Sequence, residues 1–225
     1  MGQIILPPNF YGNVDDPIII MFDGHSGAGK STFAKHFAEM VGGFHIDADE
    51  LIYETIFGNK KLSKCIYGIE PNIQDLTCRE FHFRNFKNTP DNILGLIEET
   101  RKNVETRIMS YIDAKLDSLR AEQQNGVLIP TRPIFVLGKC TSNMFNRLRG
   151  LGAKVVMLDP SNEKHHIHLL NRFNQRGQEL NPDIPFMRQE ALSRVIGDAK
   201  FDFQSRNLYD STSIKKCFEQ IAATL

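Results

Sequence analysis

The segment from Pro17 to Ile46 constrains the fold of this chain more than any other. Pro17–Asp23 is a continuous apolar run of the length expected of a strand buried on both faces. The glycine-rich stretch Gly24–Gly29 follows, and after it Lys30–Val41 places its apolar residues on one helical face. Phe44–Ile46 is a second short strand. A strand, glycine loop, helix and strand in this order predict an α/β protein with a parallel sheet.

The glycine-rich stretch fits the pattern G-x-x-x-x-G-K-[ST] from Gly24 to Ser31. Glycines in such a loop permit turns that aim backbone N–H groups inward, and the helix after it adds positive potential. We interpret it as a phosphate-binding loop, in which Lys30 bridges the β- and γ-phosphates and the Ser31 hydroxyl binds Mg²⁺. A glycine-rich turn that did not bind phosphate would need neither Lys30 nor Ser31. The residues expected around the nucleotide are Gly24, His25, Ser26, Gly27, Ala28, Gly29, Lys30, Ser31 and Thr32.

Two aspartates follow the second strand, in the sequence Asp47-Ala48-Asp49-Glu50. Residues just past the carboxyl end of a strand in an open parallel sheet face the ligand crevice. A carboxylate there can accept the proton of an attacking hydroxyl, contact the substrate or hold Mg²⁺ through water. The alternative is capping of a helix by Asp47, with Glu50 three residues later. Different residues of this group can serve both roles.

The rest of the chain predicts a helical segment inserted into the α/β core. A long helix is expected from Thr89 to about Arg120, within a mostly helical stretch over residues 51–123. Later strands are expected at Val127–Thr131, Ile134–Leu137, Lys154–Asp159 and Asn207–Asp210, and helices at Thr141–Leu148, Ser161–Arg176, Met187–Lys200 and Ser213–Ala223. We therefore expect a single domain over residues 1–225, with its core at 17–50 and 124–225 and a helical substrate-binding insertion at 51–123.

Residues Phe22–Phe57 resemble the N-terminal segment of dephospho-CoA kinases, a family of P-loop small-molecule kinases. The resemblance rests on the loop, on a helix with an F-A-E turn, and on the D-A-D triplet after an apolar pair. It implies transfer of the γ-phosphate of ATP to the ribose 3′-hydroxyl of dephospho-CoA, with Asp49 as the general base. It also implies a three-layer sandwich of the nucleotide-kinase type around a parallel sheet in the order 2-3-1-4-5.

The same resemblance suggests substrate-binding residues in the insertion. The family carries an arginine and then a phenylalanine there, and Arg79, Phe83 and Phe86 are the counterparts in this chain. Its usual His-Pro pair is absent. Together with Phe81, these phenylalanines either form a stacking platform for adenine or pantetheine, or pack the insertion onto the core.

Three arginines are candidates to contact anionic groups. Arg132 follows the strand expected at Val127–Thr131, where it either holds an anionic substrate or pairs with a nearby carboxylate. Arg172 and Arg176 are four residues apart, hence on one helix face. They are expected to close on the phosphates from a lid over about residues 172–194, and the alternative is pairing with surface carboxylates.

Composition bears on partners and location. Lysine plus arginine and aspartate plus glutamate each number 27, so the chain lacks the basic surplus of a duplex-binding protein. No apolar run approaches the ~20 residues of a membrane span, and the four cysteines form no C-x-x-C pair. We expect a cytoplasmic monomer or small homo-oligomer whose partner is a small-molecule substrate, not nucleic acid or a membrane. His165 and His168 share a helix face, but no further ligand lies nearby in the sequence, so a solvated helix is favoured over a metal site.

A phosphate loop alone does not separate a kinase from a GTPase, a motor or a transporter. The sequence has no N-K-x-D motif of the kind by which GTPases recognise their base. The favoured function is an ATP- and Mg²⁺-dependent small-molecule kinase. A nucleoside or nucleoside-monophosphate kinase would share the loop and layout, and a non-catalytic ATP-binding regulatory protein would keep the loop without needing a base.

Overall fold

The computed structural model describes residues 4–24, 27–68, 78, 81, 94–138, 142–159, 162–175, 198–201 and 211–225. In this part of the chain the strands are β1 (Ile18–Asp23), β2 (Phe44–Ile46), β3 (Ile134–Leu137), β4 (Lys154–Leu158) and β5 (Ala199–Phe201). The helices are α1 (Lys30–Val41), α2 (Ala48–Gly58), α3 (Lys60–Tyr67), α5 (Leu94–Gln124), α6 (Ser142–Gly150), α7 (Asn162–Gln175) and α9 (Ser211–Ala222), with a short 3-10 helix, η1 (Pro8–Phe10).

The five strands form one parallel sheet in the order β2-β3-β1-β4-β5, which confirms the predicted order. The central strand is β1, with Ile18 opposite Ile134 of β3 and Ile20 opposite Lys154 of β4. The connection after β1 runs towards one side of the sheet, and the connection after β3 runs to the other side. The carboxyl end of β1 is therefore a topological switch point, where open α/β sheets bind their ligands.

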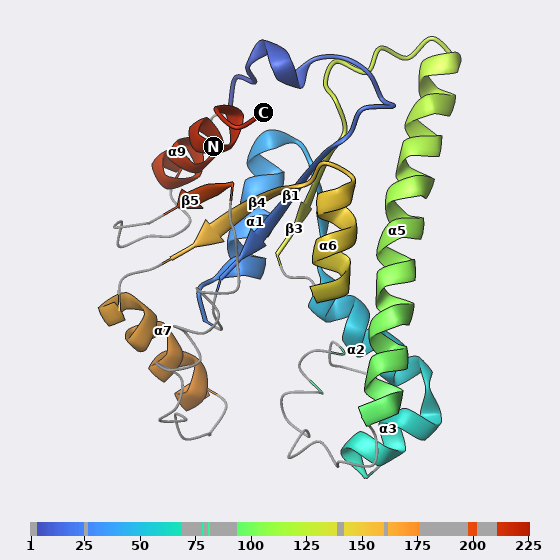
Figure 1. Cartoon of the computed structure of the whole chain (residues 1–225), viewed down its shortest axis with the longest axis vertical. Helices are drawn as coiled ribbons and strands as arrows, with labels where there is room; N and C mark the ends of the chain where they lie inside the picture. Colours follow the sequence, from blue (N-terminus) through green and yellow to red (C-terminus); the bar gives the residue numbers. More distant parts are fainter. Residues whose placement is uncertain are drawn as a thin grey trace. The chain divides into compact units, whose positions relative to one another are not determined.

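Helices cover both faces of the sheet, so the fold is a three-layer α/β sandwich (Figure 1). Successive side chains of β1 point to opposite faces of the sheet. Ile18, Ile20 and Phe22 belong to the main core cluster on one face. Ile19 and Met21 are buried on the other face. The first face is covered by α1 and α9, and α6 lies over the other (Figure 1). Burial on both sides explains why the sequence of β1 is apolar throughout.

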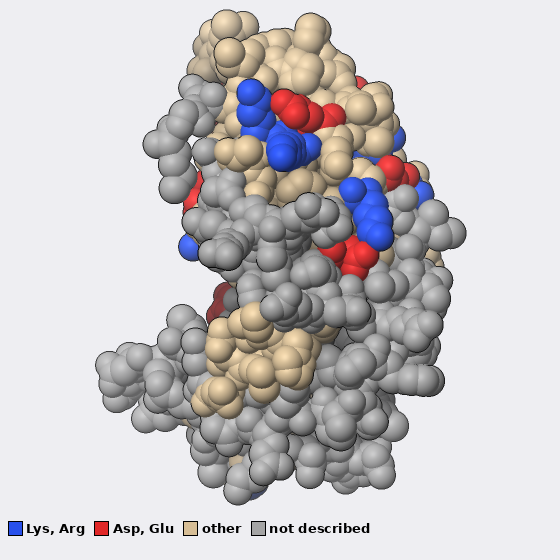
Figure 2. All heavy atoms as spheres, turned by 90° about the vertical axis from the view of Figure 1, so that its left-hand side faces the viewer, with Lys and Arg blue, Asp and Glu red and all other residues tan. Residues whose placement is uncertain are grey.

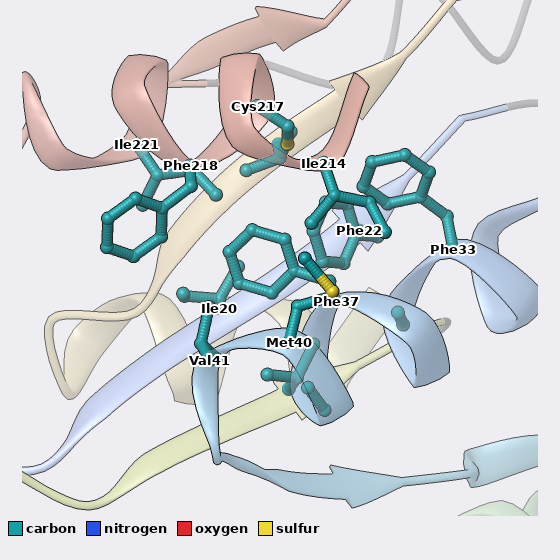
Figure 3. Packing of buried hydrophobic residues seen from close by; sticks show 14 of the residues in the cluster. Ile20, Phe22, Phe33, Phe37, Met40, Val41, Ile214, Cys217, Phe218 and Ile221 are labelled. Carbon is teal, nitrogen blue, oxygen red and sulfur yellow. The ribbon is translucent and has the colours of Figure 1, made fainter. Parts of the chain in front are cut away.

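Aromatic rings from three elements meet in the main core cluster (Figure 3). Phe37 of α1 lies 5.3 Å from Phe22 of β1 and 6.1 Å from Phe218 of α9, between ring centroids. Phe33, one turn earlier on α1, lies 5.2 Å from Phe22. The phenylalanines of α1 therefore fix this helix against the central strand and against the last helix of the chain.

The chain divides into two compact units, one made of Met1–Ile46 with Asp113–Leu225 and the other of Asp47–Ile112. The first contains the whole sheet. In the second, α2 and α3 pack through a small cluster of Ile56, Leu62 and Ile66. Its residue Arg107, on α5, donates hydrogen bonds to Glu54 at 2.6 Å and to Thr55 at 2.9 Å, and so joins α5 to α2.

Some predicted elements were wrong in detail. Val127–Thr131 is not a strand: Leu128 is 85% exposed, and Pro130 has no N–H to donate to a ladder. The helix predicted over Met187–Lys200 does not extend to Lys200, because Ala199 and Lys200 belong to β5. This strand is too short to show an alternating pattern in the sequence. The strand predicted at Asn207–Asp210 lies outside the described residues.

Charged side chains of the sheet-containing unit are placed in pairs of opposite sign. Arg120 lies 2.6 Å from Asp15, and Lys200 lies 2.8 Å from Asp159. On the face shown in Figure 2, the Lys and Arg atoms of described residues lie beside Asp and Glu rather than in a patch of one sign. This mixture accords with the equal numbers of basic and acidic residues in the sequence.

Replacement of Phe37 by alanine should lower the free energy of unfolding by about 3–5 kcal/mol, because it leaves a cavity among rings of three elements. Urea denaturation followed by circular dichroism measures this change. Leu128→Ala is the control, since its side chain is exposed and its loss should cost less than about 0.5 kcal/mol. Equal effects of the two substitutions would contradict the packing described for α1.

Candidate functional site

The glycine-rich loop joins the central strand to α1, at the switch point of the sheet. Its described glycines all have positive φ: 146° at Gly24, 79° at Gly27 and 79° at Gly29. Residues with a Cβ rarely adopt these conformations, so the loop requires glycine at all three positions. His25 and Ser26 lie outside the described residues.

The backbone approaches its surroundings closely at two of these glycines. A Cβ at Gly24 would lie 2.5 Å from the carbonyl oxygen of Leu158, at the end of β4. A Cβ at Gly27 would lie 2.7 Å from Cδ2 of Leu169, on α7. The loop is therefore held between the end of a neighbouring strand and the side of a helix, with no space for side chains at either contact.

A third close approach fixes the start of α1 and was not predicted. Gly138 follows β3, and a Cβ there would lie 2.4 Å from Cα and 2.9 Å from the backbone nitrogen of Ser31. The absence of a side chain at Gly138 lets the first turn of α1 lie directly against the end of β3. The signal in the sequence was a glycine immediately after a buried strand.

The first turn of α1 fits a phosphate group. Gly29 is the N-cap residue in a left-handed conformation, no side chain caps the helix, and its first turn contains no acidic residue. The N–H groups of this turn and the positive end of the helix are thus available to an anion. The partly buried Ser31 hydroxyl lies in the same turn, in the position from which P-loop proteins bind Mg²⁺.

The ammonium group of Lys30 lies over the loop. Nζ donates a hydrogen bond of 2.9 Å to the carbonyl oxygen of Gly24. The N–H of Gly24 donates to Oδ1 of Asp23 at 2.6 Å, so the last residue of β1 helps to orient this peptide. A positive charge is therefore held across a loop of backbone N–H groups, which is an arrangement suited to polyphosphate.

The two aspartates that follow β2 belong to the second compact unit. Oδ1 of Asp47 accepts hydrogen bonds from the N–H groups of Asp49 at 3.1 Å and Glu50 at 3.2 Å. Asp47 is thus the N-cap of α2, as the structural alternative predicted, and this bond holds its carboxylate against the helix. Asp49 lies in the first turn of α2 and is partly buried, and its backbone N–H is one of the two donors to this cap.

The position predicted for Arg132 was wrong, because it depended on a strand at Val127–Thr131. Arg132 precedes β3 and lies at the amino end of the sheet, away from the loop. Its guanidinium donates to the carbonyl oxygens of Asp16 at 2.7 Å and Asn9 at 3.0 Å, and lies 3.0 Å from the Asp16 carboxylate. Of the two alternatives for this residue, the structure shows the carboxylate pair, which joins the N-terminal segment to the sheet.

Several predicted site residues lie outside the described part of the chain. These are Arg79, Phe83, Phe86 and Arg176, together with the side chain of Arg172, whose backbone lies in α7. Phe81 is described and is buried, with ring centroids 5.2 Å from Phe57 and 5.4 Å from Tyr67. This ring therefore packs against residues of the helical unit itself, whereas the packing alternative had placed it against the core.

The histidine cluster differs from the solvated helix that we predicted. His166 is exposed, but His165 is buried and lies against Gly27 of the loop. Among the described residues, no group of three His, Cys, Asp or Glu side chains is placed to hold a metal ion. None of the described helices has the length and apolar character needed to cross a membrane.

Comparisons with known proteins return distant structural likenesses only. No family model matches the chain, and no curated protein matches it. A sugar kinase from Janibacter sp. HTCC2649 is 14% identical, with a TM-score of 0.47 over 92% of this chain and 98% of that one. The shikimate kinase of Bacteroides thetaiotaomicron is 16% identical, with a TM-score of 0.46 over 92% and 97%. The dephospho-CoA kinase of Campylobacter jejuni is 19% identical, with a TM-score of 0.38 over 92% and 96%.

These likenesses do not favour dephospho-CoA kinases over the other small-molecule kinases, so they do not support the finer family resemblance. The class of fold rests on features of the chain itself. A parallel sheet in the order β2-β3-β1-β4-β5, with G-x-x-x-x-G-K-S between the central strand and α1, defines an α/β fold of the P-loop nucleotide-kinase type.

Replacement of Gly138 by alanine should lower the free energy of unfolding by about 1–3 kcal/mol, because the new methyl group would overlap the backbone at Ser31. Gly150→Ala is the matched control: this glycine ends α6 and a Cβ there meets nothing within 4 Å. Its effect should stay within about 1 kcal/mol of wild type. Chemical denaturation compares the two, and a tolerated Gly138→Ala would show that α1 does not need this close approach.

Proposed function

We propose that this chain is an ATP- and Mg²⁺-dependent phosphotransferase that acts on a hydroxyl group of a nucleotide-like small molecule. The observation that carries the proposal is the loop itself. Lys30 Nζ is held 2.9 Å from the carbonyl oxygen of Gly24, at the uncapped start of α1. Backbone N–H groups, the helix terminus and an ammonium group converge on one small space, and this combination suits the β- and γ-phosphates of a nucleotide.

In the proposed reaction each residue has a separate task. Lys30 and the N–H groups of the loop hold the transferring phosphoryl group and the charge that develops around it. Ser31 holds Mg²⁺, which when bound neutralises phosphate charge. The acceptor oxygen forms a bond to the γ-phosphorus as the bond from that phosphorus to the β,γ-bridging oxygen breaks. ADP leaves, and the proton of the acceptor hydroxyl passes to a carboxylate.

We assign that carboxylate to Asp49. The carboxylate of Asp47 caps α2 by accepting hydrogen bonds from the N–H groups of Asp49 and Glu50, and the cap does not use the carboxylate of Asp49. The chain runs from the carboxyl end of β2 directly into these residues, and the carboxyl ends of parallel strands share one edge of a sheet. Arg172 or Arg176 is proposed to close on the phosphates, since a planar guanidinium stabilises charge spread over the transferring group.

The acceptor we favour is dephospho-CoA at its ribose 3′-hydroxyl. Support comes from the sequence resemblance over Phe22–Phe57, with Arg79, Phe83 and Phe86 as the candidates to bind the substrate. These three residues fall within the sequence range of the compact unit Asp47–Ile112. In this proposal the enzyme is cytoplasmic and works as a monomer or a small homo-oligomer.

The acceptor is tested by measuring ADP release from ATP and Mg²⁺ with dephospho-CoA, nucleosides, nucleoside monophosphates or no acceptor. We expect strong stimulation by dephospho-CoA alone. Stimulation only by a nucleoside or a nucleoside monophosphate would support the proposed phosphotransferase activity but contradict dephospho-CoA as its acceptor. Nucleotide binding without stimulation by any acceptor would instead indicate a non-catalytic ATP-binding regulatory protein.

Lys30→Ala and Asp49→Asn should each reduce turnover by about a hundredfold or more, because one removes charge stabilisation and the other removes the base. Lys35→Ala is the control, since Lys35 is an exposed lysine on the same helix. Steady-state kinetics with the best acceptor measure the loss, and thermal unfolding verifies that each variant is folded. Near-normal turnover in a folded variant would remove that residue from the mechanism.

A further inference from the structure

The buried face of α7 lies against the phosphate loop. His165 is 4% exposed and Leu169 is 2% exposed, and the two are four residues apart on this helix. Their neighbours His166, Ile167 and Leu170 are exposed. The helix therefore buries a narrow stripe, and an imidazole forms part of it.

This stripe contacts the loop at Gly27. A Cβ at Gly27 would lie 2.7 Å from Cδ2 of Leu169 and 3.4 Å from Nε2 of His165. Nε2 is thus the ring atom nearest to the loop backbone at this glycine. His165 is buried, whereas His36 and His45 are partly exposed and His166 is exposed, and the proposed chemistry has not used His165.

We propose that His165 is a positioning residue of the nucleotide site, which holds the phosphate loop in its binding conformation by filling the space behind Gly27. The inference rests on the proposed function and extends it. With φ of 79° and no side chain, Gly27 does not fix its own conformation, so the surroundings must do so. Leu169 supplies an apolar surface alone, whereas the imidazole of His165 also places a polar nitrogen, Nε2, beside the position of Gly27.

The same contact sets the register of α7 relative to the loop. Positions 165, 169 and 172 follow helical spacing, so the backbone of Arg172 continues the stripe that begins at His165. A rotation or slide of α7 that followed loss of the imidazole would move position 172 with it. His165 therefore connects the conformation of the loop to the placement of α7.

The test uses binding of a fluorescent ATP analogue with Mg²⁺, so that it does not depend on the acceptor. His165→Ala should raise Kd by about tenfold or more, since small misplacements of positioning groups have large effects. His165→Gln keeps most of the volume and carries an amide nitrogen near the place of Nε2, and it should restore Kd to within about threefold of wild type. His166→Ala, on the exposed side of the same helix, should leave Kd unchanged.

Two further measurements separate positioning from general stability. Ile221→Ala removes a fully buried side chain of α9, and should destabilise the fold by about 2–5 kcal/mol without raising Kd. In protein labelled with carbon-13 in its histidine rings, the His165 resonance, assigned through His165→Gln, should shift when the ATP analogue is added, while that of His166 should not.

An unchanged Kd in folded His165→Ala would overturn the inference. If the alanine variant fails to fold, a His165 resonance that does not shift when the ATP analogue is added would overturn it instead. The proposed function would stand in either case. Failure of the wild-type chain to bind the ATP analogue would instead overturn the proposed function, and this inference with it.

Discussion

The close approach of neighbouring elements to three glycines is the constraint on which the rest of this structure depends. At Gly24, Gly27 and Gly138 a Cβ would lie within 3 Å of a neighbouring atom. These contacts set the loop against β4 and α7, and the start of α1 against β3. Because hydrogen is the only side chain that fits, the three glycines determine how near the helix terminus and its N–H groups come to the switch point of the sheet.

The hydrophobic core keeps that terminus in place. One face of α1 packs Phe33 and Phe37 against Phe22 of the central strand and, through Phe37, against Phe218 of α9. At the amino end of the sheet, Arg132 precedes β3 and donates hydrogen bonds to the carbonyl oxygens of Asp16 and Asn9. The loop thus lies between rigid elements, and its unusual backbone conformations are stabilised by packing at a distance from the loop itself.

The pattern of the sequence was sufficient for β1, the glycine loop, α1 and β2, because an apolar run, a glycine motif and an amphipathic helix are local signals, whereas the strand order came from the family resemblance. It was insufficient where a role depends on a distant partner. Gly138 matters because α1 starts above it, and His165 because Gly27 lies beside it, and neither partner is near in the sequence. Arg132 was misplaced because Val127–Thr131 has the apolar residues of a strand, but its proline cannot join a ladder.

The strand order also determines when the sheet can form during synthesis. Both neighbours of β1 lie far downstream: Ile18 pairs with Ile134, and Ile20 with Lys154. At about 5–20 residues per second, the ribosome needs roughly 6–23 s to reach β3 after β1 has been made. During that interval one of the most apolar segments of the chain has no strand to pair with, while the helices of Asp47–Ile112 have local partners. The nascent chain is therefore most exposed to aggregation, and most suited to chaperone binding, before β3 emerges.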